Sequence, residues 1–159
     1  MSWEDNLRNG APDAEIAEKV VSALRTLFSV DSFLLENDAH ERSISHRLAL
    51  HLTPLFQEYD VDCEYNRDKH DAKVVDLPAT CTSQPTTDGS YVFPDIIIHH
   101  RNTNNNLLVI EIEKSTSNVS ERCDIEKLKV FRQQLRYQHG LFIRLQCGTT
   151  VGLDKVRWI

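Results

Sequence analysis

The sequence predicts a single α/β domain, because segments with a helical repeat alternate with short, strongly apolar segments typical of buried strands. The segments with helical spacing of apolar residues are 12–28, 38–54 and 120–138. The apolar segments are 92–98, 107–112 and 141–145. Because these strands are too apolar to have a wet face, we expect them at the centre of a mixed sheet flanked by helices.

The predicted helix ends follow from capping residues and glycine. Pro12 fits the first turn of the first helix, which follows a loose polar leader, residues 1–11. Asp38 and Glu41 have the spacing of a capping box and predict the start of the second helix. Gly140 predicts the end of the third.

The remaining segments complete the expected domain, which spans residues 1–159. Residues 61–65 alternate apolar and polar side chains, which predicts a half-buried strand. Residues 67–90 have no such pattern and predict a long loop. The asparagine-rich segment 101–106 predicts a tight turn, and residues 156–159 a last short strand.

Composition narrows the classes of function. The formal net charge of -6 argues against tight non-specific binding of DNA, but it does not exclude a metal-dependent nuclease. With no secretory signal and no apolar run long enough to cross a bilayer, we expect a cytoplasmic protein without a membrane partner. The four cysteines lie far apart in the sequence and are expected to be free thiols.

Acidic residues interrupt two of the most apolar strands. Asp95 precedes Ile96-Ile97-Ile98, and Glu111 and Glu113 lie within the segment 108–114. Because side chains alternate along a strand, both glutamates face one side of the sheet and Lys114 the other. If the two strands pair as a hairpin, Asp95 and Glu111 approach each other, and a cation such as Mg²⁺ or Mn²⁺ would relieve their repulsion.

Pro94-Asp95 followed by Glu111-Ile112-Glu113 resembles the motif of the PD-(D/E)xK phosphodiesterase superfamily. Residues 38–145 also follow the order of its restriction-endonuclease-like αβββαβ core, here preceded by an extra N-terminal helix. Segments 36–43 and 137–143 are similar to a poorly characterised bacterial branch. The resemblance implies hydrolysis of a phosphodiester in nucleic acid, DNA more than RNA, and such small nucleases often act as homodimers or beside a partner protein.

The resemblance also implies roles for individual residues. Asp95 and Glu111 match the metal ligands, together with the backbone carbonyl of Ile112. Glu41 matches the acidic residue that many members carry on the first core helix. The family usually has lysine where this chain has Glu113, although some restriction endonucleases carry glutamate there and remain active.

A cation for the substrate phosphate would then come from the third helix, where Lys127, Lys129 and Arg132 are candidates. These residues also fit an ordinary solvated helix face. Glu41 could simply close the capping box, and Glu113 could lie in solvent at the end of its strand. Two hypotheses follow: a Mg²⁺- or Mn²⁺-dependent nuclease, or an inactive module of the same fold that binds nucleic acid or a protein.

Overall fold

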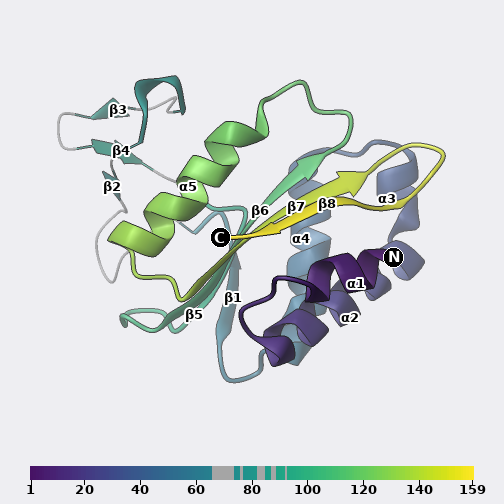
Figure 1. Cartoon of the computed structure of the whole chain (residues 1–159), viewed down its shortest axis with the longest axis horizontal. Coiled ribbons are helices and arrows are strands. Elements are labelled where there is room, and N and C mark those ends of the chain that lie inside the picture. Colours follow the sequence, from purple (N-terminus) through teal and green to yellow (C-terminus); the bar gives the residue numbers. More distant parts are fainter. Residues whose placement is uncertain (66–73, 76, 82–84, 87–88, 92) are drawn as a thin grey trace.

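A computed structural model of the chain describes residues 1–65, 74–75, 77–81, 85–86, 89–91 and 93–159 (Figure 1). The main sheet contains β1 (Asp60–Cys63), β5 (Ile96–His99), β6 (Asn106–Lys114), β7 (His139–Gln146) and β8 (Gly152–Trp158), in that spatial order. The β6–β7 pair is parallel and the other neighbouring pairs are antiparallel. The predicted α/β class with a mixed sheet is therefore confirmed.

Helices cover both faces of this sheet (Figure 1). On one face lie α1 (Trp3–Arg8), α2 (Ala14–Val30), α3 (Ser32–Glu36) and α4 (Glu41–Leu52), which the short 3₁₀ helix η1 (Thr53–Leu55) follows. On the other face lies α5 (Glu121–Gln134), which packs on β6 and β7. None of the helices in the described ranges is both long and apolar enough to span a bilayer.

The alternation of side chains along β6 decides which layer each residue meets. Ile110 and Ile112 lie in the core beneath α2 and α4, whereas Val109 packs with Leu128 and Phe131 of α5. Because the side-chain period of a strand is two, Glu111 and Glu113 share the face of Val109. The two glutamates therefore point toward the α5 layer, although β6 is buried along nearly its whole length.

The N-terminal leader was predicted to be loose, and this prediction is wrong. Residues 3–8 form α1, whose start is closed by a reciprocal capping box between Ser2 and Asp5. Leu7 is fully buried, and the indole N–H of Trp158 donates to its carbonyl oxygen at 2.9 Å. The helix persists because β8 holds it, which the local sequence does not reveal. Helix α2 begins at Ala14 with Asp13 as its N-cap, so Pro12 lies before the first turn rather than within it as predicted.

The predicted capping box between Asp38 and Glu41 is also wrong. The N-cap of α4 is His40, whose ring nitrogen accepts from the Arg42 N–H at 3.1 Å. Asp38 takes a left-handed backbone conformation with φ of 51° and accepts a 2.7 Å hydrogen bond from Thr116. A long-range contact thus outcompetes the local cap. The helix α3 before it was not predicted.

Three boundaries near β5 and α5 differ from the prediction. β5 begins only at Ile96, because Pro94 cannot donate to a strand ladder. Helix α5 ends at Gln134, where Arg136 adopts a φ of 58° and makes the turn expected of Gly140. Gly140 instead lies inside β7, and β8 begins at Gly152, four residues before the strand predicted at 156–159.

The predicted loop 67–90 contains ordered pieces between β1 and β5. β2 (Val74–Val75), β4 (Gly89–Tyr91) and β3 (Pro85–Thr86) form a small sheet in that order. The 3₁₀ helix η2 (Ala79–Cys81) lies between them in sequence, and Cys81 forms a disulfide with Cys123 of α5. The prediction of four free thiols is wrong for this pair and correct for Cys63 and Cys147. The other residues of 67–90 lie outside the described ranges.

Candidate functional site

Asp95 and Glu111 meet where β5 begins beside β6. Ile96 pairs with Ile110 in the antiparallel ladder, so the residue before it lies next to Glu111. The backbone N–H of Ile112 donates to Asp95 Oδ2 at 2.7 Å, and the two carboxyl groups lie close enough for each to shift the pKa of the other. The approach expected from the hairpin register is therefore present.

Burial makes two negative charges at this position costly. Burial raises the pKa of Glu111 well above its usual range, and the charge of Asp95 raises it further. Burial also raises the pKa of Asp95, although Lys127 and the Ile112 N–H oppose the shift. At neutral pH the pair must hold a proton or be joined by a cation.

Lys127 of α5 supplies a cation to this pair. Its ammonium nitrogen lies 3.0 Å from Glu111 Oε1 and donates to the carbonyl oxygen of Phe93 at 3.2 Å. Burial lowers the pKa of Lys127, but the charges of Glu111 and Asp95 outweigh it and the net shift is upward. The ammonium therefore stays charged, and α5 places it directly against the Asp95–Glu111 pair.

Two further carboxyl groups lie close enough for the charge of Asp95 to raise their pKa values. They belong to Glu41, at the start of α4, and to Asp124 in α5. Burial, followed by the charges of Asp95 and Asp124, raises the pKa of Glu41 to about 7. Burial likewise raises the pKa of Asp124 to about 6, with Lys127 opposing and Asp95 reinforcing the shift. Glu41 thus belongs to the acidic site rather than to a capping box.

Glu113 is buried on the same face of β6, with 2% of its surface exposed. The interpretation of Glu113 as a solvent-exposed strand end is therefore wrong. Burial raises its pKa, and Arg144 of β7 opposes the shift. Arg144 Nε lies 3.9 Å from Glu113 Oε2 and 3.5 Å from a carboxylate oxygen of Asp154, so its charge is shared.

We refer to these residues together as the carboxylate cluster: Glu41, Asp95, Glu111, Glu113 and Asp124. Lys127 and the shared Arg144 do not balance its charge when every acid is ionised. Hard oxygen donors with excess negative charge suit Mg²⁺ or Mn²⁺. In the described part of the chain no three His, Cys, Asp or Glu side chains already have the arrangement of metal ligands. The donor chemistry and the buried charge nevertheless fit a divalent ion.

The predicted phosphate-binding residues divide into two groups. Lys127 reaches the carboxylate cluster, whereas Lys129 is partly exposed and pairs with Glu126 at 3.6 Å. Arg132 is exposed on the surface of α5. That Lys129 and Arg132 bind phosphate stays a prediction. They could do so only where nucleic acid extends over the surface of α5, away from the carboxylate cluster.

The sequence analysis missed Asp124 and Arg144. Asp124 lies three residues before Lys127, so both occupy one face of α5, and this spacing is visible in the sequence. Arg144 pairs with Glu113 only through the parallel register of β6 and β7. That register depends on the crossover through α5 and has no local sign in the sequence.

Comparison of the chain with protein-family models, with curated proteins and with solved structures found no match. Function is therefore inferred from the residues of the site and from the order of the elements that carry them.

Proposed function

We propose that the protein is a metal-dependent phosphodiester hydrolase acting on nucleic acid, with a core of the PD-(D/E)xK type. The observation that carries the proposal is the adjacent carboxyl pair of Asp95 and Glu111, with the Lys127 ammonium 3.0 Å from Glu111 Oε1. The order α4, β1, β5, β6, α5, β7 supports it, because it is the αβββαβ order of that superfamily. The parallel β6–β7 pair across α5 fits the same topology.

Asp95, Glu111 and the carbonyl of Ile112 would hold the Mg²⁺ or Mn²⁺ ion. When bound, the ion supplies polarisation of a phosphate oxygen and a lower pKa for a coordinated water. The Ile112 N–H fixes the orientation of the Asp95 carboxylate through its 2.7 Å hydrogen bond. Glu111 is buried within β6, and Asp95 directly precedes β5, so the backbone sets both ligand positions before substrate arrives.

The residues around Asp95 and Glu111 supply the other two roles, charge neutralisation and proton acceptance. Lys127 neutralises charge on the phosphate, the task that lysine at the position of Glu113 performs in related enzymes. Glu41, with a pKa of about 7, and Asp124, with a pKa of about 6, can accept the proton of the attacking water near neutral pH. Glu113, whose nearest cation is Arg144 Nε at 3.9 Å, is a further candidate base.

A second candidate function is a non-catalytic module on the same core that binds nucleic acid or a protein. The contact between Lys127 and Glu111 favours it, because an internal cation can neutralise the site without a metal ion. The net charge of -6 makes a protein partner as reasonable as nucleic acid.

Cleavage assays with Mn²⁺ on single- and double-stranded DNA and on RNA test the first proposal. We expect Glu111→Gln and Asp95→Asn to abolish cleavage, and Glu15→Gln, an exposed position of α2 outside the cluster, to retain it. Calorimetry with Mn²⁺ separates the two candidates: binding that disappears in Glu111→Gln supports catalysis. Failure of millimolar Mn²⁺ to bind, with no cleavage of any substrate, would reject the hydrolase in favour of the module.

A further inference from the structure

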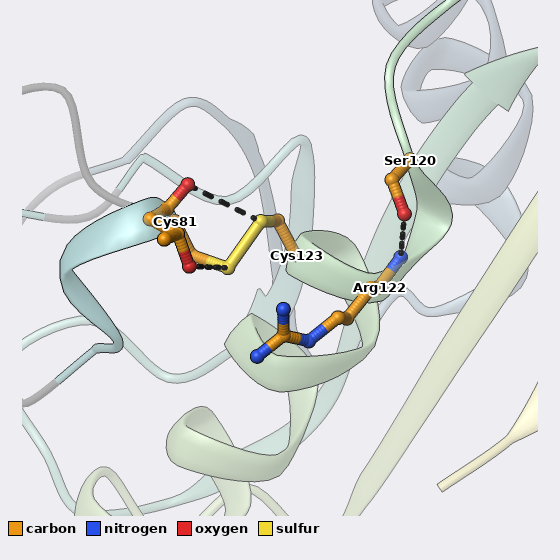
Figure 2. Close-up of a disulfide and its surroundings, with 5 residues drawn as sticks. Cys81, Ser120, Arg122 and Cys123 are labelled. Carbon is orange, nitrogen blue, oxygen red and sulfur yellow. Dashed lines mark hydrogen bonds between the residues drawn. A yellow bond between two sulfur atoms is a disulfide. The ribbon is translucent and has the colours of Figure 1, made fainter.

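The disulfide Cys81–Cys123 ties the segment between β1 and β5 to helix α5. It links η2 to the first turn of α5 across a sequence separation of 42 residues (Figure 2). Both half-cystines are partly exposed, so a reductant in solution can reach the bond. In a reducing compartment a bond of this kind is usually transient, catalytic or redox-sensing.

The tied end of α5 carries residues of the proposed site. Asp124 directly follows Cys123, and Lys127 lies one turn further along the helix. Lys127 also donates to the carbonyl of Phe93, which leads into Pro94-Asp95. The disulfide and this hydrogen bond therefore join the same two pieces of chain, α5 and the segment that leads into Asp95.

The base of the segment is fixed separately. The backbone N–H of Glu64 lies 2.9 Å from the carbonyl of Pro94 and 3.3 Å from that of Asp95. These bonds do not involve sulfur, so they remain when the disulfide is reduced. Reduction then breaks the link to α5 while the backbone bonds of Pro94 and Asp95 to Glu64 are kept.

Helix α5 has its fully buried apolar anchors, Leu128 and Phe131, beyond its first turn. The first turn is held by the disulfide and by Ser120 Oγ, which accepts from the Arg122 N–H at 3.2 Å (Figure 2). A partly exposed ion pair between Glu121 and Lys155 of β8, at 2.5 Å, adds a third contact there. Asp124 lies between these two regions. Loss of the disulfide should loosen the first turn locally while the helix stays folded.

We propose that Cys81–Cys123 is a thiol–disulfide exchange site through which a dithiol reductant weakens metal binding at the carboxylate cluster. The effect on metal rests on the proposed function. A thiolate of the reductant attacks one sulfur, the S–S bond breaks, and the other cysteine leaves as a thiolate that takes up a proton. The second thiol of the reductant then displaces the first cysteine as a thiol, so two electrons and two protons pass to the protein and the reductant becomes a disulfide.

Two measurements on the full chain, oxidised and reduced with a dithiol, test this inference. Hydrogen exchange reports on the amides of residues 121–127, and calorimetry gives the dissociation constant of Mn²⁺. We expect reduction to speed exchange in this segment and to weaken Mn²⁺ binding on the order of tenfold, the usual effect of losing support around metal ligands. Reoxidation should reverse both changes. Cys81→Ser should match the reduced protein under both conditions, and Cys63→Ser should respond as the wild type does.

The outcomes distinguish failure of this inference from failure of the proposed function. Unchanged exchange in residues 121–127 on reduction overturns the inference, whatever the metal does. Faster exchange with unchanged Mn²⁺ affinity also overturns it, because the tether then has no effect on the site. Mn²⁺ that binds in neither state rejects both the metal site and the regulation proposed for it, and exchange then reports on the tether alone.

Discussion

The contact between Lys127 and Glu111 gives a quantitative test of the site. Lys127→Met keeps most of the apolar stem and removes the ammonium that lies 3.0 Å from Glu111 Oε1. Removing one partner of a buried ion pair costs about 3–5 kcal/mol. Glu111, whose pKa already lies well above its usual range, can take up a proton and escape part of this cost. We therefore expect the free energy of unfolding to fall by about 3 kcal/mol.

Thermal and urea denaturation in the presence of a chelator measure this change. In a domain of this size, 1 kcal/mol shifts Tm by about 2–4 °C, so Lys127→Met should lose about 6–12 °C. Glu111→Gln and the double variant complete a mutant cycle. Groups in contact give coupling energies of about 0.5–3 kcal/mol, and we expect the upper half of that range.

The same variant distinguishes a structural ion pair from a metal site. Mn²⁺ at about one hundred times its dissociation constant stabilises a native state by about 2.7 kcal/mol. This gain in stability nearly equals the loss expected from Lys127→Met. Mn²⁺ should therefore restore most of the Tm that Lys127→Met loses, and none of it when Glu111→Gln is added. If the effects of the two single substitutions simply add in the double variant, the two side chains do not interact as described. A Tm of Lys127→Met equal to that of the wild type would refute the reasoning.

Three further predictions concern pH, the motif position and the disulfide. Because the carboxyls of Glu41 and Asp124 have raised pKa values of about 7 and 6 in the folded state, the metal-free protein binds more protons than the unfolded chain between about pH 4 and 7. Its free energy of unfolding should therefore fall as the pH rises through that window, while its affinity for Mn²⁺ rises. A free energy of unfolding that does not change with pH, measured by denaturation in the presence of a chelator, would contradict this prediction. Glu113→Lys, which introduces the lysine of the proposed superfamily motif, places a cation beside Arg144 and should destabilise the protein by about 3–5 kcal/mol in urea, whereas Glu113→Gln should be mild. Cys81→Ser should cost about 4 kcal/mol, from the chain entropy of a closed loop of this length, and an unchanged urea midpoint would show that the bond adds no stability.

The pattern of β6 could be predicted because it depends on a local rule. Alternation along a strand places Glu111 and Glu113 on one face whatever the rest of the chain does. Pairing with the preceding strand follows from the short turn at 101–106, where Asn102 takes a φ of 58° as asparagine readily does. The central acidic pair was therefore within reach of sequence reasoning.

Contacts between segments far apart in the chain could not be predicted from the sequence. Asp38 and Thr116 lie far apart in sequence, yet their hydrogen bond replaces the predicted capping box. The pairing of Cys81 with Cys123 depends on where η2 lies over α5, and cysteine spacing does not determine it. Lys127 could be named as a candidate but could not be chosen over Lys129, because the rotation of α5 about its axis is set by its core residues.

The burial of β6 has a consequence for the choice of ion. A strand hydrogen-bonded to β5 on one side and β7 on the other cannot bend without breaking two ladders. In the proposed metal site, Glu111 and the Ile112 carbonyl are mounted on this strand. They would resist the spread of a few tenths of an ångström that separates magnesium–oxygen distances of about 2.0–2.1 Å from calcium–oxygen distances of about 2.3–2.6 Å. Under that proposal the strand favours the smaller ion over calcium.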